Sequence, residues 1–261
     1  MNLTRACAMT LTMLAIGTAA TAEIKTREIE YTQGETTLQG YLAWNDSLPG
    51  KRPGVLVVHE WWGHNAHARR QAERLARAGY VSFALDMYGK GKVTTHPNEA
   101  QAFMAEAAKD PAAMAARFEA ARATLVADPH VDPSRLAAIG YCFGGAVVLG
   151  QARAGADLKA VASFHGSLGT DHPAQLGKVK ARLLVMTGAD DPFVPPAAVA
   201  AFEKEMKAAG AKVQVIRYPG AKHSFTNPEA EKAGMNELAY NADADRKSWE
   251  AMLKLFAQAL K

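Results

Sequence analysis

The 261-residue sequence predicts an α/β fold with a mostly parallel, twisted sheet, helices on both faces and an N-terminal antiparallel hairpin. Short continuous apolar runs, which suit strands buried on both faces, recur along the chain. Helix-compatible segments separate these runs and can supply the right-handed crossovers that parallel neighbours need. Two runs of alternating polar and apolar residues come before this pattern, as a hairpin requires.

Each element follows from its local pattern. The hairpin is expected from residues 26–31 and 36–44, with its turn at Gln33-Gly34-Glu35. Gly79 ends the first helix, and Asp110-Pro111 interrupts the second helical region. The parallel strands are expected at residues 54–59, 80–86, 135–140, 159–164, 182–187 and 213–218. The helices are expected at residues 66–78, in one or two pieces within 97–127, and at 146–152, 196–209 and 241–261.

Residues 1–22 have the features of a secretory signal. Arg5 lies near the start, residues 11–16 form an apolar centre, and Ala20-Thr21-Ala22 precedes Glu23 as a small-residue cleavage site. The apolar centre is too short to span a bilayer core of about 30 Å. We therefore expect an exported protein, periplasmic or secreted, whose mature chain is a single domain of residues 23–261 and has no membrane contact after signal removal.

Signal removal would leave Cys142 as the only cysteine of the mature chain, because the sequence has two and the other is Cys7. A single thiol cannot form an internal disulfide in a compartment where disulfides persist. A lone free cysteine is most often an inert packing residue. The residues around Cys142 instead indicate a functional thiol.

Cys142 is the centre of a nucleophile elbow, Gly140-Tyr141-Cys142-Phe143-Gly144-Gly145. An apolar strand candidate precedes the motif and a helix-compatible run follows it, which is the context that such an elbow needs. The flanking glycines are required because side chains there would collide with the neighbouring strand and helix. A thiol at the start of a helix can become the reactive thiolate more easily than a free one.

Two further side chains can complete a catalytic triad with Cys142. Asp191 and His223 follow later strands of the predicted sheet, so all three residues are expected at the carboxyl edge, where ligands bind in such sheets. Their order, nucleophile then acid then histidine, is that of α/β-hydrolases. Asp190 competes for the acid role, but Asp191 directly precedes a rigid Pro192–Pro195 turn that could aim its carboxylate at His223.

The sequence resembles the dienelactone hydrolase family of the α/β-hydrolase fold, and the resemblance extends over essentially the whole mature chain. A cysteine in the elbow combined with a glutamate after the first parallel strand is its most specific part. The segments that carry it are Val58-His59-Glu60-Trp61-Trp62-Gly63, Leu85-Asp86-Met87-Tyr88, residues 140–145, residues 188–195 and His223-Ser224-Phe225.

The resemblance implies roles for individual residues. Cys142 would be the nucleophile, His223 its base and Asp191 the residue that orients the histidine. Glu60 would be a partner of the resting thiol. The backbone N–H groups of Phe143 and Trp61 would form the oxyanion hole.

Family members that hydrolyse dienelactone are expected to hold its carboxylate with two arginines. Lys90 stands at or near the first of these positions and Asn227 at the second, so a less acidic ester or lactone is expected here. Lys222 also departs from the glycine that many members have before the histidine. The candidates for lining the substrate pocket are Tyr88, Lys90, Trp62 and His165, the last with the alternative that its ring only bonds a loop.

The leading interpretation is a carboxylic ester or lactone hydrolase that works through an acyl-enzyme. The alternatives are an idle ligand-binding protein on the same scaffold and a redox-responsive thiol protein. The residues at 59–64 resemble a zinc-binding HExxH motif, but the two histidines are one position too far apart and begin on a strand, so neither metal nor cofactor is expected. The net charge is +4, but the basic residues are scattered among acidic ones and form no patch, so nucleic-acid binding is not expected. The expected partner is a small-molecule substrate, and the expected oligomeric state is a monomer.

Overall fold

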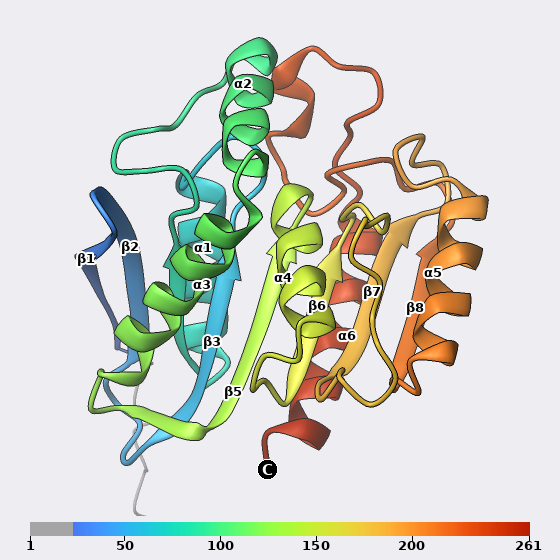
Figure 1. Ribbon diagram of the computed structural model, residues 1–261. Coiled ribbons are helices and arrows are strands. Elements are labelled where there is room, and N and C mark those ends of the chain that lie inside the picture. Colours follow the sequence, from blue (N-terminus) through green and yellow to red (C-terminus); the bar gives the residue numbers. More distant parts are fainter. Residues whose placement is uncertain (1–22) are drawn as a thin grey trace, which may run out of the picture.

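Eight strands form one sheet in the order β1-β2-β4-β3-β5-β6-β7-β8 in the computed structural model, which describes residues 23–261 (Figure 1). The expected signal segment, residues 1–22, lies outside the described residues. The strands are β1 (Ile24–Gln33), β2 (Thr36–Asn45), β3 (Arg52–Val58), β4 (Val81–Leu85), β5 (Val131–Tyr141), β6 (Ala160–Phe164), β7 (Arg182–Gly188) and β8 (Val213–Tyr218).

The pairing of the strands confirms the predicted fold. Strands β1 and β2 form an antiparallel hairpin, and β2 also runs antiparallel to β4. The pairs β3–β4, β3–β5, β5–β6, β6–β7 and β7–β8 are all parallel. The helices are α1 (Ala66–Arg77), α2 (Pro97–Ala108), α3 (Pro111–Val126), α4 (Phe143–Arg153), α5 (Pro196–Ala208) and α6 (Ala242–Ala259), with a short 3-10 helix η1 (Ala230–Ala233).

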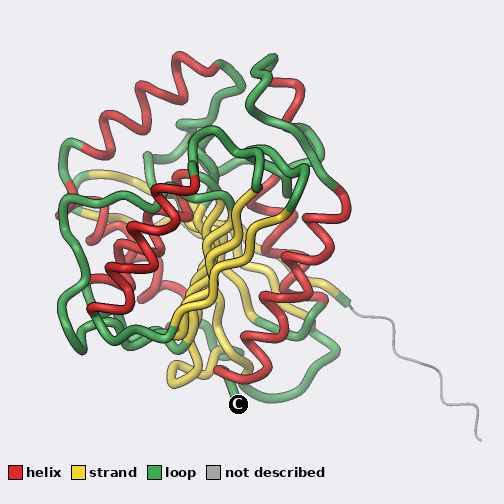
Figure 2. The backbone as a smooth tube through the Cα atoms, turned by 90° about the vertical axis from the view of Figure 1, so that its right-hand side faces the viewer, coloured by secondary structure: helices red, strands yellow, loops and turns green. Residues whose placement is uncertain are grey.

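The helices cover the sheet on both sides, as the tube view along its edge shows (Figure 2). On one side, α3, α4 and α5 contribute to an apolar core with one set of strand side chains, and on the other α1 and α6 contribute to a second core. Strand β3 contributes side chains to both cores: Leu56 and Val58 belong to the first core, and Val55 and Val57 belong to the second. This burial on both faces explains why the parallel strands read as continuous apolar runs.

One helix boundary differs from the sequence prediction, and one choice that the sequence left open is resolved. Helix α4 begins at Phe143, directly after the elbow cysteine, rather than at residue 146, because the glycines in between are needed for close packing and still take helical conformations. The interrupted region is two helices, α2 and α3. The Asp110 side chain caps α3 by accepting a hydrogen bond from the Ala113 N–H at 2.9 Å, and Pro111 takes the first helical position.

The elbow glycines allow α4 to approach the sheet closely. A Cβ added to Gly144 would collide with the backbone carbonyls of Val58 and His59 at the end of β3. A Cβ added to Gly140 would collide with the backbone of Gly144 itself. By contrast, a Cβ at Gly150, two turns further along α4, would meet open space.

We expect Gly144→Ala to lower the free energy of unfolding by about 1–3 kcal/mol, because backbone cannot move aside as a flexible side chain can. The melting temperature should fall by roughly 2–4 °C for each kcal/mol in a domain of this size. Gly150→Ala is the matched control on the same helix and should raise stability by about 0.5–1 kcal/mol through helix propensity. Thermal unfolding followed by circular dichroism measures both; equal melting temperatures would contradict the close approach of α4.

None of the helices within residues 23–261 is long and apolar enough to cross a membrane.

Candidate active site

The loops at the carboxyl edge of the sheet bring the three predicted triad residues together. Cys142 follows β5, Asp191 lies just beyond β7, and His223 lies beyond β8. These loops meet at the upper edge of the sheet in Figure 1, below helix α2 and the segment that carries η1. The parallel direction of these strands places all three ends at one edge.

Cys142 occupies the strained turn between β5 and α4. Its backbone has a φ of 53°, a left-handed conformation that non-glycine residues rarely adopt. Its N–H is held by two acceptors, the Phe164 carbonyl at 3.0 Å and the His165 Nδ1 at 3.2 Å. The side chain is half-buried, and it is the free cysteine of the described residues. The turn therefore presents the thiol at the edge of the sheet while its backbone is fixed.

His223 is held between Asp191 and Cys142. Its Nδ1 lies 2.8 Å from Asp191 Oδ2, and its ring lines the same cavity as the Cys142 side chain. Burial lowers the pKa of His223, but the negative charge of Cys142, together with the hydrogen bonds and charge of Asp191, more than offsets it and raises the pKa to about 10. The ring is therefore an imidazolium at neutral pH.

Asp191 is fully buried, whereas the competing Asp190 is exposed. The second oxygen of Asp191, Oδ1, accepts a hydrogen bond from the Phe193 N–H at 2.9 Å. This bond comes from the proline-flanked turn that the sequence singled out, and it fixes the carboxylate while Oδ2 faces His223. Of the two adjacent aspartates that the sequence offered as partners of His223, the structure thus places Asp191 against the ring and Asp190 in solvent.

Glu60 is 1% exposed, and both of its carboxylate oxygens are occupied. Ser224 Oγ donates to Oε1 at 2.7 Å, and Asn227 Nδ2 donates to Oε2 at 2.8 Å. The resemblance implied a partnership between Glu60 and the thiol; in the structure the carboxylate instead ties down the loop that carries His223. Asn227, noted in the sequence only as a missing arginine, supplies one of these bonds because its amide reaches Glu60.

A cavity of about 370 Å³ opens onto the thiol. Phe193 is half exposed at its wall, with its ring 5.1 Å from the His223 ring and perpendicular to it. Apart from the histidine, the lining carries no ionisable side chain other than the thiol itself. The lining residues are Trp61, Gln101, Met104, Cys142, Phe143, Ala146, Ser167, Phe193, His223, Met235 and Leu238.

The four residues predicted to line the substrate pocket are not among them. Lys90 is exposed and ion-paired with Glu30 at 2.5 Å, outside the cavity. Trp62 packs on Trp61 with ring centroids 4.8 Å apart and lines a separate cavity of about 100 Å³. All four residues follow strands that end at the edge where the triad lies, but a position near a strand end does not determine the direction of a side chain.

Tyr88 lies beneath the cavity wall rather than in it. It is buried against Phe143, with ring centroids 5.3 Å apart, and its hydroxyl has no hydrogen-bond partner among the described residues. Burial raises the pKa of Tyr88, and the negative charge of Cys142 raises it further. The phenol therefore stays protonated.

His165 is also fully buried, and its ring bonds loop residues, which is the alternative that the sequence left open. Burial lowers its pKa far below the usual value, and the nearby positive charge of His223 acts in the same direction, so the ring is neutral. Its Nδ1 accepts from the Cys142 N–H, which leaves Nε2 to donate to Thr226 Oγ1 at 2.9 Å. His165 thus supports the elbow from behind.

Within residues 23–261, no group of three or more histidine, cysteine, aspartate or glutamate side chains is arranged to hold a metal ion. The two histidines of the HExxH-like segment have different surroundings. The His59 ring accepts a hydrogen bond from the Met87 N–H at 3.1 Å, and His64 is buried at another position, next to the start of α1.

Comparisons with known proteins agree with this fold. The solved structure named m3DLH superposes with a TM-score of 0.87 at 42% identity, covering 91% of this chain and 99% of the other. A dienelactone hydrolase-like promiscuous phosphotriesterase from metagenomic libraries superposes with a TM-score of 0.88 at 38% identity, covering 92% and 100%. A Synechocystis protein named "Putative carboxymethylenebutenolidase" is 30% identical over 92% of this chain and 100% of its own length.

The family model for the dienelactone hydrolase family matches residues 38–260, which is nearly all of the described chain. The eight-stranded mixed sheet with its N-terminal antiparallel pair is the α/β-hydrolase fold. The chain therefore belongs to the dienelactone hydrolase family and is a hydrolase of that type.

Proposed function

We propose that this protein hydrolyses a small, uncharged carboxylic ester or lactone through an acyl-enzyme formed on Cys142. The observation that carries the proposal is the arrangement at the cavity: a thiol in a strained elbow shares the lining with His223, whose Nδ1 is fixed by Asp191 at 2.8 Å. Family membership supports the reaction class, and the contacts support the assignment of the groups.

Acylation begins when the Cys142 thiolate attacks the carbonyl carbon of the substrate. A C–S bond forms, and the carbonyl π electrons move onto oxygen. When that oxyanion collapses, the C–O bond to the alcohol breaks, and the His223 imidazolium gives its proton to the departing oxygen. The raised pKa of His223 keeps this proton available at neutral pH.

Deacylation reverses the roles. Neutral His223 takes a proton from a water molecule whose oxygen attacks the thioester carbon. The C–S bond then breaks, releasing the carboxylic acid and restoring the thiolate beside the imidazolium. Asp191 keeps Nδ1 protonated throughout, so that Nε2 is the atom that exchanges the proton.

The oxyanion would be held by the backbone N–H groups of Phe143 and Trp61. The N–H groups of Cys142, Gly144 and Gly145 all donate to carbonyl oxygens of the protein. Phe143, as the first residue of α4, retains a donor that has no partner among the described residues. Such a donor is typically worth about 3–4 kcal/mol of transition-state stabilisation.

The lining of the cavity supports an uncharged substrate. Lys90 is outside it, and Asn227 is bonded to Glu60, so neither position offers a cation to a substrate carboxylate. Trp61, Met104, Phe193, Met235 and Leu238 give the wall an apolar character. An ester or lactone without a carboxylate suits this wall better than dienelactone does.

The acyl-enzyme can be tested by mass spectrometry of the intact protein. During turnover of a p-nitrophenyl ester, rapid acid quenching should give a species heavier by the mass of the acyl group, and peptide mapping should place it on Cys142. A burst of nitrophenol should accompany it. Negligible turnover across a broad ester and lactone panel, together with saturable binding, would instead favour an idle binding protein.

We also propose that the protein is exported, with Glu23 as its first mature residue. The support is the sequence of residues 1–22: an early positive charge, a short apolar centre and a small-residue cleavage site. The same mass measurement, made on protein expressed from the full-length gene in a Gram-negative host and recovered from the periplasm or medium, tests it. A cytoplasmic protein that retains its first 22 residues would contradict export.

A further inference from the structure

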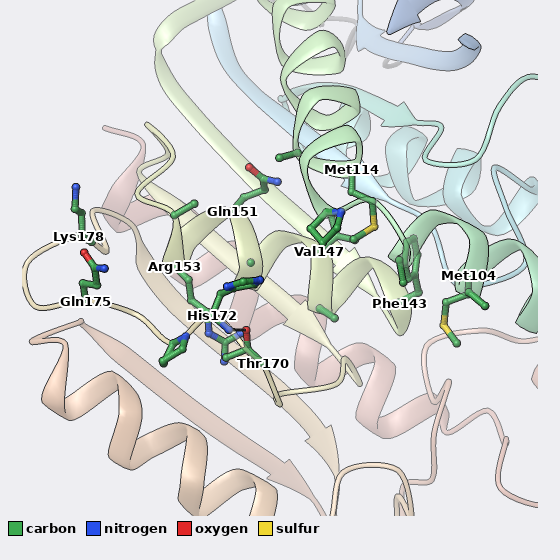
Figure 3. A pocket seen from close by; sticks show the side chains of 18 residues that line it. Met104, Met114, Phe143, Val147, Gln151, Arg153, Thr170, His172, Gln175 and Lys178 are labelled. Carbon is green, nitrogen blue, oxygen red and sulfur yellow. Dashed lines mark hydrogen bonds between the residues drawn. The ribbon is translucent and has the colours of Figure 1, made fainter. Parts of the chain in front are cut away.

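A second, larger apolar cavity adjoins the one that holds the thiol. It has a volume of about 680 Å³ and lies between helices α2 and α3 on one side and α4 on the other (Figure 3). Met104, Phe143 and Ala146 line both cavities. The two spaces are therefore neighbours that share a wall beside the elbow, and Figure 3 shows Phe143 and Met104 together at one end of the groove.

The walls of this groove suit a narrow, flexible, apolar group. Ala146, Gly150 and Ala154 follow one another at intervals of four residues along α4, so they lie on one face of the helix. Met104 and Met114 lie opposite, and methionine adapts to ligands of variable shape. From Ala146 to Ala154 the helix rises about 12 Å, which is the length of roughly eight to ten extended carbon atoms.

The charge of the groove also favours an uncharged occupant. Its buried cation, Arg153, is neutralised by Glu205, whose two carboxylate oxygens accept from the guanidinium at 2.9 Å each. Arg153 also donates to the Leu168 carbonyl at 2.7 Å. The ionisable residues that remain, His172 and Lys178, are exposed. Lys178 lies at the end of the groove remote from Phe143 and Met104, whereas His172 lies beside Arg153 (Figure 3).

We propose that this groove is a binding site for a medium-length linear alkyl arm of the ester substrate, which extends from the reacting carbonyl at Cys142 along α4 towards Ala154. The inference rests on the proposed function, since the arm is bound to the carbonyl that Cys142 attacks. The wall shared with the thiol cavity is what identifies a substrate arm as the occupant, because an arm that extends from a carbonyl at Cys142 past Met104 and Phe143 would enter the groove.

The first test is a chain-length series. A fully buried methylene is worth about a fourfold gain in affinity, and the groove is open on one side, so about twofold per methylene is expected. Between a four-carbon and a ten-carbon chain, kcat/KM should rise on the order of 50-fold. One series of p-nitrophenyl esters lengthens the acyl chain, and one series of acetate esters lengthens the alcohol; the series that shows the rise identifies which arm occupies the groove.

The second test fills the groove. Gly150→Trp places an indole where an added Cβ meets open space, in an ordinary helical conformation, so folding should be retained. The ratio of kcat/KM for the ten-carbon over the four-carbon ester should fall at least tenfold. Ala201→Trp adds the same group at an exposed position of α5, outside both cavities, and should keep the wild-type ratio.

The outcomes separate the two proposals. If neither an ester nor a lactone is turned over, the proposed function fails. If short esters are turned over but neither series rises with length, or Gly150→Trp leaves the ratio unchanged, the groove does not bind a substrate arm and the proposed function stands. If Gly150→Trp instead changes the oligomeric state measured by light scattering and not the ratio, the groove is an interface between copies of the chain, and the inference is overturned.

Discussion

Cys142→Ala is expected to lower kcat/KM for a short carboxylic ester by at least about 10⁴-fold, because alanine has no atom that can form the covalent bond to the substrate. His223 and Asp191 alone would leave only the slow attack of water. The measurement is steady-state hydrolysis of an ester, with wild-type contamination excluded by the absence of thiol labelling. Cys142 is the only cysteine of residues 23–261, so the labelling test is unambiguous on protein produced without residues 1–22.

Cys142→Ser is the conservative companion variant. The hydroxyl has nearly the shape of the thiol, but it does not ionise beside an imidazolium as a thiol does, so its activity should also be strongly reduced. Both variants should keep a melting temperature near that of the wild type, since the side chain is half-buried and the turn is held by backbone bonds. Turnover above about one per cent of wild type in a folded, label-free Cys142→Ala sample would remove Cys142 from the role of nucleophile.

Peroxide treatment, combined with the Cys142→Ala variant, distinguishes a catalytic nucleophile from a redox-responsive thiol. Peroxide should abolish hydrolysis by oxidising the thiolate if Cys142 is the nucleophile. A redox-responsive protein would instead switch a function on and off with reversible oxidation, and that function would persist, without the switch, in Cys142→Ala.

The parts of the structure that sequence reasoning predicted correctly are those fixed by burial or by backbone sterics. The parallel strands are buried on both faces, so their runs are apolar without interruption, as Val55 to Val58 in β3 show. The elbow is recognisable because Gly140 and Gly144 have no room for a side chain. Such constraints restrict which residue types can occupy these positions, so they can be recognised from the local sequence alone.

The parts that could not be predicted depend on which way side chains turn and on segments distant in the chain. Met104 of α2 and Met235 near η1 reach the thiol cavity from elements whose positions no motif encodes. The bond between Asn227 and Glu60 joins residues 167 positions apart. Lys90 follows a strand at the correct edge, yet it pairs with Glu30 because that carboxylate on β1 is within its reach.

The second large effect on kcat/KM is expected from a substitution at Asp191, with its neighbour Asp190 as the control. Asp191→Asn is expected to lower kcat/KM by about 10² to 10⁴-fold, because an amide can hold Nδ1 in the wrong protonation state and cannot stabilise the imidazolium. Asp190→Asn is the matched control: it makes the same chemical change one residue away on an exposed side chain, and it should stay close to wild type. Esters with an aliphatic alcohol should be used, because their leaving oxygen needs the proton of His223.

The pH dependence distinguishes a role in orienting His223 from a merely structural one. His223 donates only while protonated, and its pKa is raised to about 10, so wild-type kcat/KM should fall on the alkaline side as pH passes through that value. Asp191 contributes to the raised pKa through a hydrogen bond and its charge, so Asp191→Asn should shift this fall to lower pH, while Asp190→Asn should leave it in place. If Asp191 only braced the turn at Phe193, its loss would lower the melting temperature and leave the alkaline fall where it is. A shift caused by Asp190→Asn instead would assign the orienting carboxylate to the neighbouring residue.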